Sequence, residues 1–362
     1  MVLKHEYRLL TCTLPRFRII PGFDLTPPLI SRSERLDGMG TDNGLFEIAK
    51  SIVGNVGLVI IGKEEAIERG VIALLCGGHL LIEDVPGVGK TMLARSIART
   101  TGCSFSRIQF TPDLLPSDIT GVSVFNQSTT EFEYRPGPII SQVVLADEIN
   151  RATPKTQSAL LEAMGEGQVT IDGLTHVLPK PAVVLATLNP IDYEGTFPLP
   201  EGQLDRFLMR IDLGYPAFDD EVAILESHRS EHPIDTLQPV VTPELIIELQ
   251  EYVRRVHADP LILRYIVSLV EATRGHMETQ LGVSPRGSLA LFRTSQALAF
   301  IRGRDYVLPD DVKEMARSVL AHRIVVTPSG RMKGIEGKDI VNWVLEESPI
   351  PSGRGSQGWA AR

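Results

Sequence analysis

The segment from Glu83 to Thr91 combines glycine, lysine and threonine in an order that suits phosphate binding. It reads Glu83-Asp84-Val85-Pro86-Gly87-Val88-Gly89-Lys90-Thr91, and Met92 follows. The usual pattern is G-x-x-x-x-G-K-[ST], so Asp84 stands where the first glycine belongs. Gly87 and Gly89 would let backbone N–H groups turn toward phosphate oxygens, while Lys90 neutralises them and Thr91 binds Mg²⁺. We predict a nucleotide site at residues 84–92, with the Asp84 side chain facing away from the phosphates.

Two carboxylates end another apolar run, 57 residues beyond Lys90. The run is Val143-Val144-Leu145-Ala146-Asp147-Glu148. An Asp-Glu pair alone is common at solvated strand ends, but its order and spacing after the phosphate loop suit a nucleotide hydrolase. Asp147 would hold the Mg²⁺ shell, and Glu148 would orient and deprotonate the attacking water.

Three further polar residues could complete such a site. Asn189 follows an apolar run and could hold the water or the γ-phosphate without adding charge. Taken alone, Asn189 is more simply a turn residue at a strand end, because a proline follows it. Arg206 and Arg286 could stabilise phosphate charge in the transition state, and Arg286 would lie in the first turn of a helix.

Short apolar runs alternate with helical patterns up to residue 215, which favours a parallel sheet covered by helices on both faces. The predicted helices are 45–52, 64–75, 91–101 and 154–164, and the predicted strands are 79–83, 105–109, 142–146, 182–187 and 208–213. Two segments read instead as hairpins, Val122–Tyr134 and Gln168–Leu178. The second contains Asp172-Gly173, the favoured pair for a type I′ turn.

The pattern becomes all-helical after Tyr215-Pro216. Helix starts with proline at the first position recur at Pro243, Pro260, Pro285 and Pro309. We predict a nucleotide-binding core at 41–215 with two hairpin insertions, a helical domain at 216–340 and a loose tail at 341–362. Residues 1–40 are predicted to be a disordered extension, or a start codon placed too early, with Met39 as the alternative start.

The composition excludes several classes of protein. With 362 residues, 43% hydrophobic and 22% charged, the chain is typical of a soluble two-domain globular protein, not of a coiled coil or collagen. Its net charge of -9 disfavours general affinity for nucleic acid. Three cysteines without C-x-x-C spacing indicate no disulfide framework, and no apolar run reaches the roughly 20 residues of a membrane helix. We expect a cytoplasmic protein without a membrane span.

One motif is interpreted as a coincidence. His228-Arg229-Ser230-Glu231-His232 matches the H-x-x-E-H pattern of zinc proteases. Because Pro233 follows at once, no long helix could position the ligands, and we predict no metal site there.

The longer motifs resemble those of the MoxR family of AAA+ ATPases. They are Ala146-Asp147-Glu148-Ile149-Asn150-Arg151-Ala152 with its continuation Gln157–Met164, then Leu188-Asn189-Pro190, and Leu199–Phe207. The resemblance covers about residues 45–326. It implies a P-loop AAA+ fold, with a three-layer α/β core and parallel sheet followed by a small all-helical lid.

The resemblance also implies roles and partners. Residues 84–91 would be Walker A, 143–148 Walker B, Asn189 sensor 1 and Arg286 sensor 2. Arg206 is the best candidate for an arginine finger that completes a neighbouring subunit's site, and Arg151 is the second candidate. The hairpins would face the central opening of a ring. Implied with them are ATP, Mg²⁺, a homo-oligomeric ring, most often a hexamer, and a protein client, often with a von Willebrand A domain protein as partner.

Three functions compete at this point. The favoured one is an ATP-hydrolysing ring that remodels or matures partner complexes, for example by cofactor or metal insertion. A nucleic-acid-dependent motor is disfavoured by the acidic charge balance and by the second hairpin, whose Asp172 tip lacks lysine and arginine. An ATP-binding switch with little turnover is disfavoured by the presence of Glu148.

Overall fold

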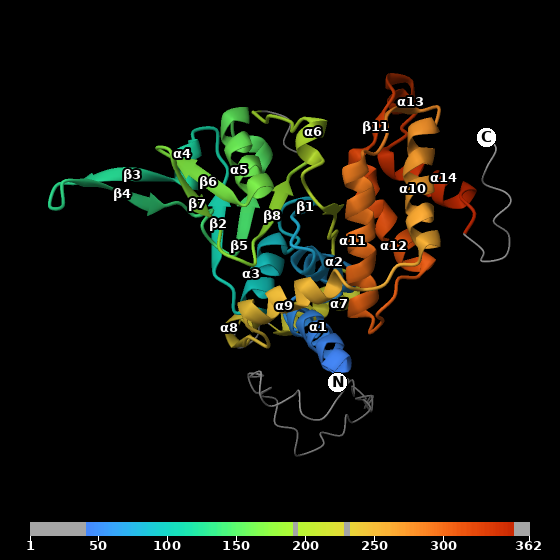
Figure 1. Cartoon of the computed structure of the whole chain (residues 1–362), viewed down its shortest axis with the longest axis horizontal. Coiled ribbons are helices and arrows are strands. Elements are labelled where there is room, and N and C mark those ends of the chain that lie inside the picture. Colours follow the sequence, from blue (N-terminus) through green and yellow to red (C-terminus); the bar gives the residue numbers. More distant parts are fainter. Residues whose placement is uncertain (1–40, 191–194, 228–231, 351–362) are drawn as a thin grey trace, which may run out of the picture.

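A parallel sheet forms the centre of the first part of the chain in the computed structural model, which describes residues 41–190, 195–227 and 232–350 (Figure 1). Its strands are β1 (Leu80–Glu83), β2 (Phe105–Gln109), β5 (Val143–Asp147), β8 (Val183–Leu188) and β9 (Met209–Ile211). They form one five-stranded sheet in the order β2-β5-β8-β1-β9 with every pair parallel. The five predicted strands are confirmed to within two residues at each end.

Helices cover both faces of this sheet. On one face lie α1 (Thr41–Gly57), α2 (Glu64–Leu75) and α3 (Lys90–Thr100), and on the other α4 (Pro116–Thr120) and α5 (Pro154–Glu166). Successive residues of β5 alternate between them: Val143 and Leu145 pack with α1–α3, whereas Val144 and Ala146 pack with α5. The three-layer α/β core is therefore confirmed. Because successive side chains of a strand point to opposite faces, apolar residues along β5 bury both faces of the sheet.

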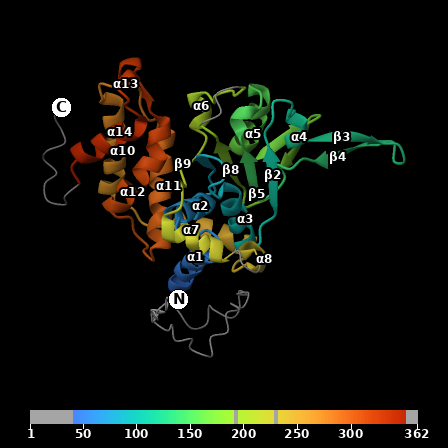
Figure 2. The same cartoon turned by 180° about the vertical axis from the view of Figure 1, so that it is seen from behind.

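Both predicted hairpins are present. Strands β3 (Gly121–Asn126) and β4 (Glu131–Pro136) form one that projects far from the core, and β6 (Gln168–Ile171) with β7 (Leu174–Val177) forms the other (Figures 1 and 2). The second turns at Asp172 and Gly173 with φ of 50° and 80°, as a type I′ turn requires. Tyr134 of β4 stacks on His176 of β7 with ring centroids 3.8 Å apart, so the two hairpins contact each other.

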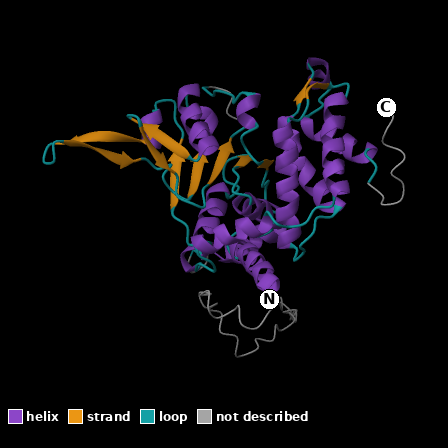
Figure 3. Ribbon diagram, viewed as in Figure 1, coloured by secondary structure: helices purple, strands orange, loops and turns teal. Residues whose placement is uncertain are grey.

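The remaining elements are mainly helical (Figure 3). They are η1 (Ile149–Arg151), α6 (Glu201–Leu204), α7 (Phe218–Ser227), α8 (Pro233–Thr236), α9 (Pro243–Val253), α10 (Pro260–Gly275), β10 (Thr279–Leu281), α11 (Pro285–Ile301), α12 (Pro309–Leu320), η2 (Ala321–Arg323), β11 (Val325–Val326), α13 (Pro328–Met332) and α14 (Gly337–Glu347). All four proline-marked helix starts are confirmed. Helices α7, α8, α13 and α14 were not predicted, although α8 and α13 also begin at a proline.

The packing divides the chain differently from the prediction. Residues 232–256 run back along α1–α3, where the backbone N–H of Val240 donates to Thr100 O at 2.9 Å and Gln250 donates to Leu74 O at 2.7 Å. The separate bundle beside the core consists of α10–α14 with η2 and the β10–β11 pair, and we call it the lid (Figure 1). The predicted start of the loose tail at residue 341 was wrong, because α14 continues to Glu347 and its Val341 and Val344 are buried.

The lid and the core share one hydrophobic cluster. It runs from α1–α3 through α9 to α11 and α12, so the lid rests on apolar side chains of the core. A charged contact lies beside it, where Arg69 of α2 pairs with Glu314 of α12 at 3.3 Å. Within the described ranges, no helix has the length and apolar character needed to cross a membrane.

Candidate functional site

The predicted phosphate loop lies between β1 and α3, at the carboxyl edge of the sheet. Gly87 and Gly89 have φ of 89° and 95°, in the left-handed region that glycine adopts without strain. A Cβ at either position would meet no atom within 4 Å. Glycine is therefore required here by the backbone conformation, and the N-terminus of α3 is accessible to an anion.

Asp84 fixes the start of this loop to the neighbouring edge strand. Its carboxylate accepts hydrogen bonds from the backbone N–H groups of Val85 at 2.7 Å, Leu213 at 2.7 Å and Gly214 at 2.6 Å. The last two residues follow β9. A carboxylate with three N–H donors can be buried at low cost, which explains an aspartate where the usual pattern has glycine.

Lys90 lies between the phosphate loop and the carboxylate pair Asp147-Glu148. Its Nζ donates to the main-chain oxygen of Asp84 at 2.6 Å and is buried. Burial lowers the pKa of Lys90, and the nearby carboxylates of Asp147, Asp84 and Glu148 act in the opposite direction. The predicted phosphate-binding lysine and both predicted carboxylates therefore lie in one electrostatic environment.

Asp147 is held at the end of β5 by residues from both neighbouring strands. Arg107 of β2 donates to its Oδ2 at 2.6 Å, and Thr187 of β8 donates to its Oδ1 at 2.6 Å. Only 12% of the Asp147 side chain is exposed. Its carboxylate is thus oriented by two donors before any ligand is considered.

Glu148 has an uncommon backbone conformation. Its φ is 57°, which non-glycine residues adopt at a cost of about 1–3 kcal/mol and which clusters at functional sites. The hydroxyl of Thr187 accepts the Glu148 backbone N–H at 2.8 Å and so helps to hold this conformation. The Glu148 carboxylate accepts from Gln109 and from Arg151, each at 3.0 Å.

Three members of this site were not predicted from the sequence: Arg107, Gln109 and Thr187. A signal for the first two existed, since polar residues at i and i+2 near the end of a strand share a face. Their relevance depends on β2 pairing with β5, and strand order was not predicted. Thr187 directly follows Ala186, the last residue of β8 that pairs with β5, so its place beside Asp147 also depends on the strand order.

Asn189 follows β8, the strand next to β5, and is 5% exposed. Its main-chain oxygen accepts from Asn150 Nδ2 at 3.3 Å. The position beyond β8 places Asn189 at the same sheet edge as Asp147 and Glu148, as parallel strands end together.

The two predicted arginines lie away from this cluster. Arg206 donates to Leu161 O of α5 at 2.7 Å, and a Cβ on Gly165 would meet its Nη1 at 2.7 Å. Arg286, in the first turn of α11, lies 3.9 Å from Asp205, the residue before Arg206. Arg151 instead pairs with Glu148 of its own chain.

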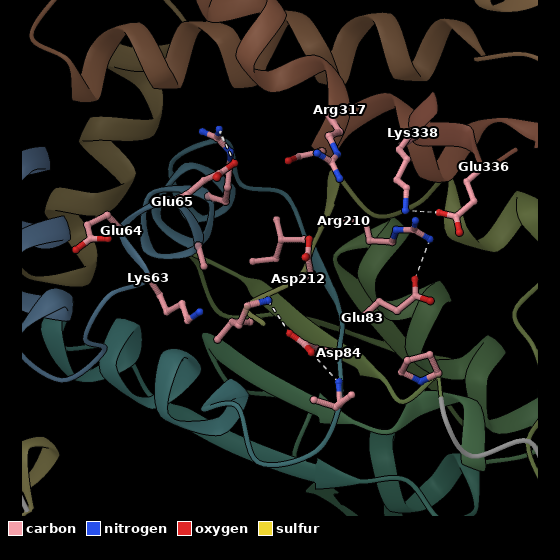
Figure 4. A pocket seen from close by; sticks show the side chains of 18 of the residues that line it. Lys63, Glu64, Glu65, Glu83, Asp84, Arg210, Asp212, Arg317, Glu336 and Lys338 are labelled. Carbon is pink, nitrogen blue, oxygen red and sulfur yellow. Dashed lines mark hydrogen bonds and ion pairs between the residues drawn. The ribbon is translucent and has the colours of Figure 1, made fainter. Parts of the chain in front are cut away.

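A polar pocket of about 630 Å³ adjoins the loop between core and lid (Figure 4). Arg317 and Lys338 of the lid face Glu83 and Arg210 of the core across it, and the core pair is 2.8 Å apart. Its other walls include Gly62 and Lys63, which precede α2, and the loop residues Asp84 and Val85. The carboxyl ends of parallel strands are where open α/β sheets bind ligands, and this pocket touches the start of the loop at Asp84 and Val85.

The structure describes the H-x-x-E-H motif only at its last residue. Residues 228–231 lie outside the described part of the chain. His232 is the N-cap of α8, and its Nδ1 accepts from the backbone N–H of Ile234 at 3.4 Å.

Comparisons with known proteins agree with this geometry. Residues 79–209 match the ATPase family associated with various cellular activities, and residues 271–343 match the AAA lid domain. The protein YeaC of Bacillus subtilis, itself uncharacterized, is 51% identical over 86% of this chain and 98% of its own length. Chaperone MoxR1 of Mycobacterium tuberculosis is 42% identical over 86% of this chain and 82% of its own.

Two further matches extend the comparison. Protein MoxR of Paracoccus denitrificans is 33% identical over 75% of this chain and 86% of its own. A crystal structure of a candidate ATPase from Cytophaga hutchinsonii superimposes with a TM-score of 0.81 at 39% identity, covering 85% of this chain and 96% of that one.

Proposed function

Because the chain belongs to the MoxR family of AAA+ ATPases, we propose that it hydrolyses ATP to ADP and phosphate at the site formed by residues 84–92, Asp147 and Glu148. One observation carries the proposal. The buried ammonium of Lys90 shares its environment with the carboxylates of Asp147 and Glu148, at the edge of the sheet where α3 begins. A cation for the phosphates and a base for the water are thus adjacent.

Binding follows from the loop. The N–H groups of Gly87 to Thr91 and the dipole of α3 attract the phosphates, and Lys90 neutralises the β and γ oxygens. The base and ribose extend into the polar pocket between core and lid. Thr91 and Asp147 supply oxygen donors, which fit Mg²⁺, and the ion when bound would neutralise charge on the phosphates.

Glu148 acts as the general base. Its left-handed backbone turns the side chain out of the line of β5, and Gln109 and Arg151 fix the carboxylate by two hydrogen bonds. A carboxylate oriented in this way can accept a proton from water attacking the γ-phosphate. Asn189, at the same edge, orients that water or the γ-phosphate.

The Glu148→Gln variant tests hydrolysis. It keeps the shape of the side chain but removes the base, so we expect ATP binding close to wild type and a turnover number lower by about 10²- to 10⁴-fold. A fluorescent nucleotide measures binding and phosphate release measures turnover. Glu251→Gln, an exposed carboxylate on α9, is the matched control. Unchanged turnover in Glu148→Gln would refute the hydrolytic assignment.

We further propose that hydrolysis requires a ring of identical subunits, with Arg206 completing the neighbour's site. The proposal is supported by the position of Arg206 on the opposite face of the sheet from the helix that follows the phosphate loop. Arg206 hydrogen-bonds α5, whose buried residues belong to the core on one face, whereas those of α3 belong to the core on the other. An arginine held on the far face suits a role in trans better than one at its own phosphate loop.

Mixed rings test this role. Arg206→Ala should bind ATP but lose hydrolysis by roughly 10³-fold or more, because a missing finger leaves transition-state charge uncompensated. Lys90→Ala should lose its own site but keep an intact Arg206. Mixing the two inactive variants should restore measurable phosphate release. No recovery, in mixtures shown by pull-down to contain both subunits, would refute Arg206 as a finger in trans.

The work of the ring is proposed to be chaperone-like remodelling or maturation of a partner protein complex, with a von Willebrand A domain protein among its partners. The similarity to Chaperone MoxR1 and the net charge of -9 support a protein client over a nucleic acid. Glu148→Gln should hold ATP and client together, so co-purification with this variant identifies the client.

A further inference from the structure

Arg323 is a buried charged residue of the lid that the nucleotide site does not use. It ends η2, the turn after α12, and only 2% of its side chain is exposed. Its guanidinium donates to Asp205 Oδ1 at 2.8 Å, Phe207 O at 2.5 Å and Leu208 O at 3.2 Å. All three acceptors belong to the core segment Asp205–Leu208, which carries Arg206.

Arg323 is fixed on the lid side as well. Its Nη1 donates to Val319 O of α12 and to Nε2 of His322, 2.9 Å away. Burial, and next the charge of Arg323, hold the pKa of His322 well below its ordinary value, so the imidazole is neutral and can accept. The planar guanidinium thus has acceptors on both sides, in a geometry that a lysine cannot reproduce.

Asp205 links this contact to the second arginine. Its Oδ2 accepts from the hydroxyl of Ser284 at 3.2 Å and lies 3.9 Å from Arg286. Ser284 is the N-cap residue of α11, but its side chain makes no capping hydrogen bond and donates to Asp205 instead. One carboxylate therefore connects the segment holding Arg206 to η2 and to the first turn of α11.

We propose that Arg323 is a positioning residue for the arginine finger: it fixes segment 205–208 to the lid, so that Arg206 and Arg286 are presented together to the neighbouring subunit. The inference rests on the proposed role of Arg206 in trans. The lid also lines the subunit's own nucleotide pocket through Arg317 and Lys338. The lid thus lines the nucleotide pocket of its own subunit, and it also holds Arg206 for the nucleotide site of the neighbouring subunit.

Arg323→Gln tests the proposal. We expect ATP binding and KM near wild type and a turnover number lower by about 10- to 100-fold, since a misplaced group weakens the transition state more than the ground state. Mixing with Lys90→Ala should raise the activity of Arg323→Gln sites, because the Lys90→Ala neighbour supplies a correctly held Arg206. A merely structural defect would not be rescued in trans.

A double variant tests whether Arg323 acts through Arg206. Arg206→Ala with Arg323→Gln should be no slower than Arg206→Ala alone, because the group to be positioned is already gone. A clear further loss of turnover would overturn the proposal. Wild-type turnover in Arg323→Gln would overturn it too.

Controls separate folding from positioning. Arg304→Gln removes another lid arginine, which binds Asp311 rather than segment 205–208, and should give no loss that mixing rescues. If Arg323→Gln fails to bind ATP or unfolds early, Asp205→Asn keeps the shape and weakens the same contact, and it must then show the rescuable loss. If Arg206→Ala alone hydrolyses normally, the finger assignment fails; if only Arg323→Gln is normal, this inference alone fails.

Discussion

At the scale of single residues, Thr187 holds both proposed catalytic carboxylates in place. It is fully buried in β8, and its hydroxyl donates to Asp147 and accepts the backbone N–H of Glu148. Without that acceptor, Glu148 would have an unpaired buried N–H in addition to its left-handed backbone. One hydroxyl therefore positions both the proposed Mg²⁺ ligand, Asp147, and the proposed base, Glu148.

We predict that Thr187→Val is destabilised by about 1–3 kcal/mol, because valine keeps the shape but leaves the Glu148 N–H without an acceptor and removes one of the donors to Asp147. Turnover should fall by about 10- to 100-fold, with KM for ATP changed far less, because Glu148 is displaced from the attacking water. Urea denaturation and steady-state kinetics measure the two effects. Thr170→Val, on the exposed face of β6, should alter neither. Wild-type kinetics in Thr187→Val would contradict this role.

At the scale of elements, the sequence predicted the helix starts and the turn that depend on one or two neighbouring residues. Helices α9 to α12 begin at proline, because its fixed φ suits the first helical position and it has no N–H to leave unpaired. The Asp172-Gly173 turn follows from positive φ at both positions. Helix α14 was not predicted, although Ile340, Val341 and Val344 have helical spacing and Asp339 caps its start; these apolar residues pack against α10 and α12.

At the scale of the whole molecule, two neutral histidines hold parts of the fold together, and of these His322 is buried and His79 is half-buried. His79 donates from Nε2 to Met164 O at 3.0 Å and accepts the Val184 N–H on Nδ1 at 3.1 Å, joining the start of β1 to α5 and β8. Burial lowers its pKa, and burial with the Arg323 charge lowers that of His322 further. Protonation of His79 would break its contact with β8, and protonation of His322 would remove the acceptor that Arg323 uses.

Stability should therefore fall on mild acidification. Because both pKa values are lower in the folded than in the unfolded state, the unfolded chain binds more protons below its own pKa of about 6.5. The stabilisation is present above that pH and decreases as the pH falls from 7.5 to 5.5, by on the order of 1 kcal/mol per histidine. Denaturant titrations at several pH values measure it. His79→Asn and His322→Asn should each flatten the slope, and an unchanged slope in both would contradict the assignment.

The sequence alone determined the strands, most helices, the phosphate loop and the two carboxylates, since each depends on residues close together in the chain. Only the tertiary structure decided the strand order, and with it Arg107, Gln109 and Thr187 beside Asp147 and Glu148. It also decided the contacts of Asp205 with Ser284 and Arg323, which lie 79 and 118 residues away. Buried polar groups must form hydrogen bonds, and the folded structure decides which residues lie close enough to be partners. The spacing of residues along one sequence does not indicate these pairs.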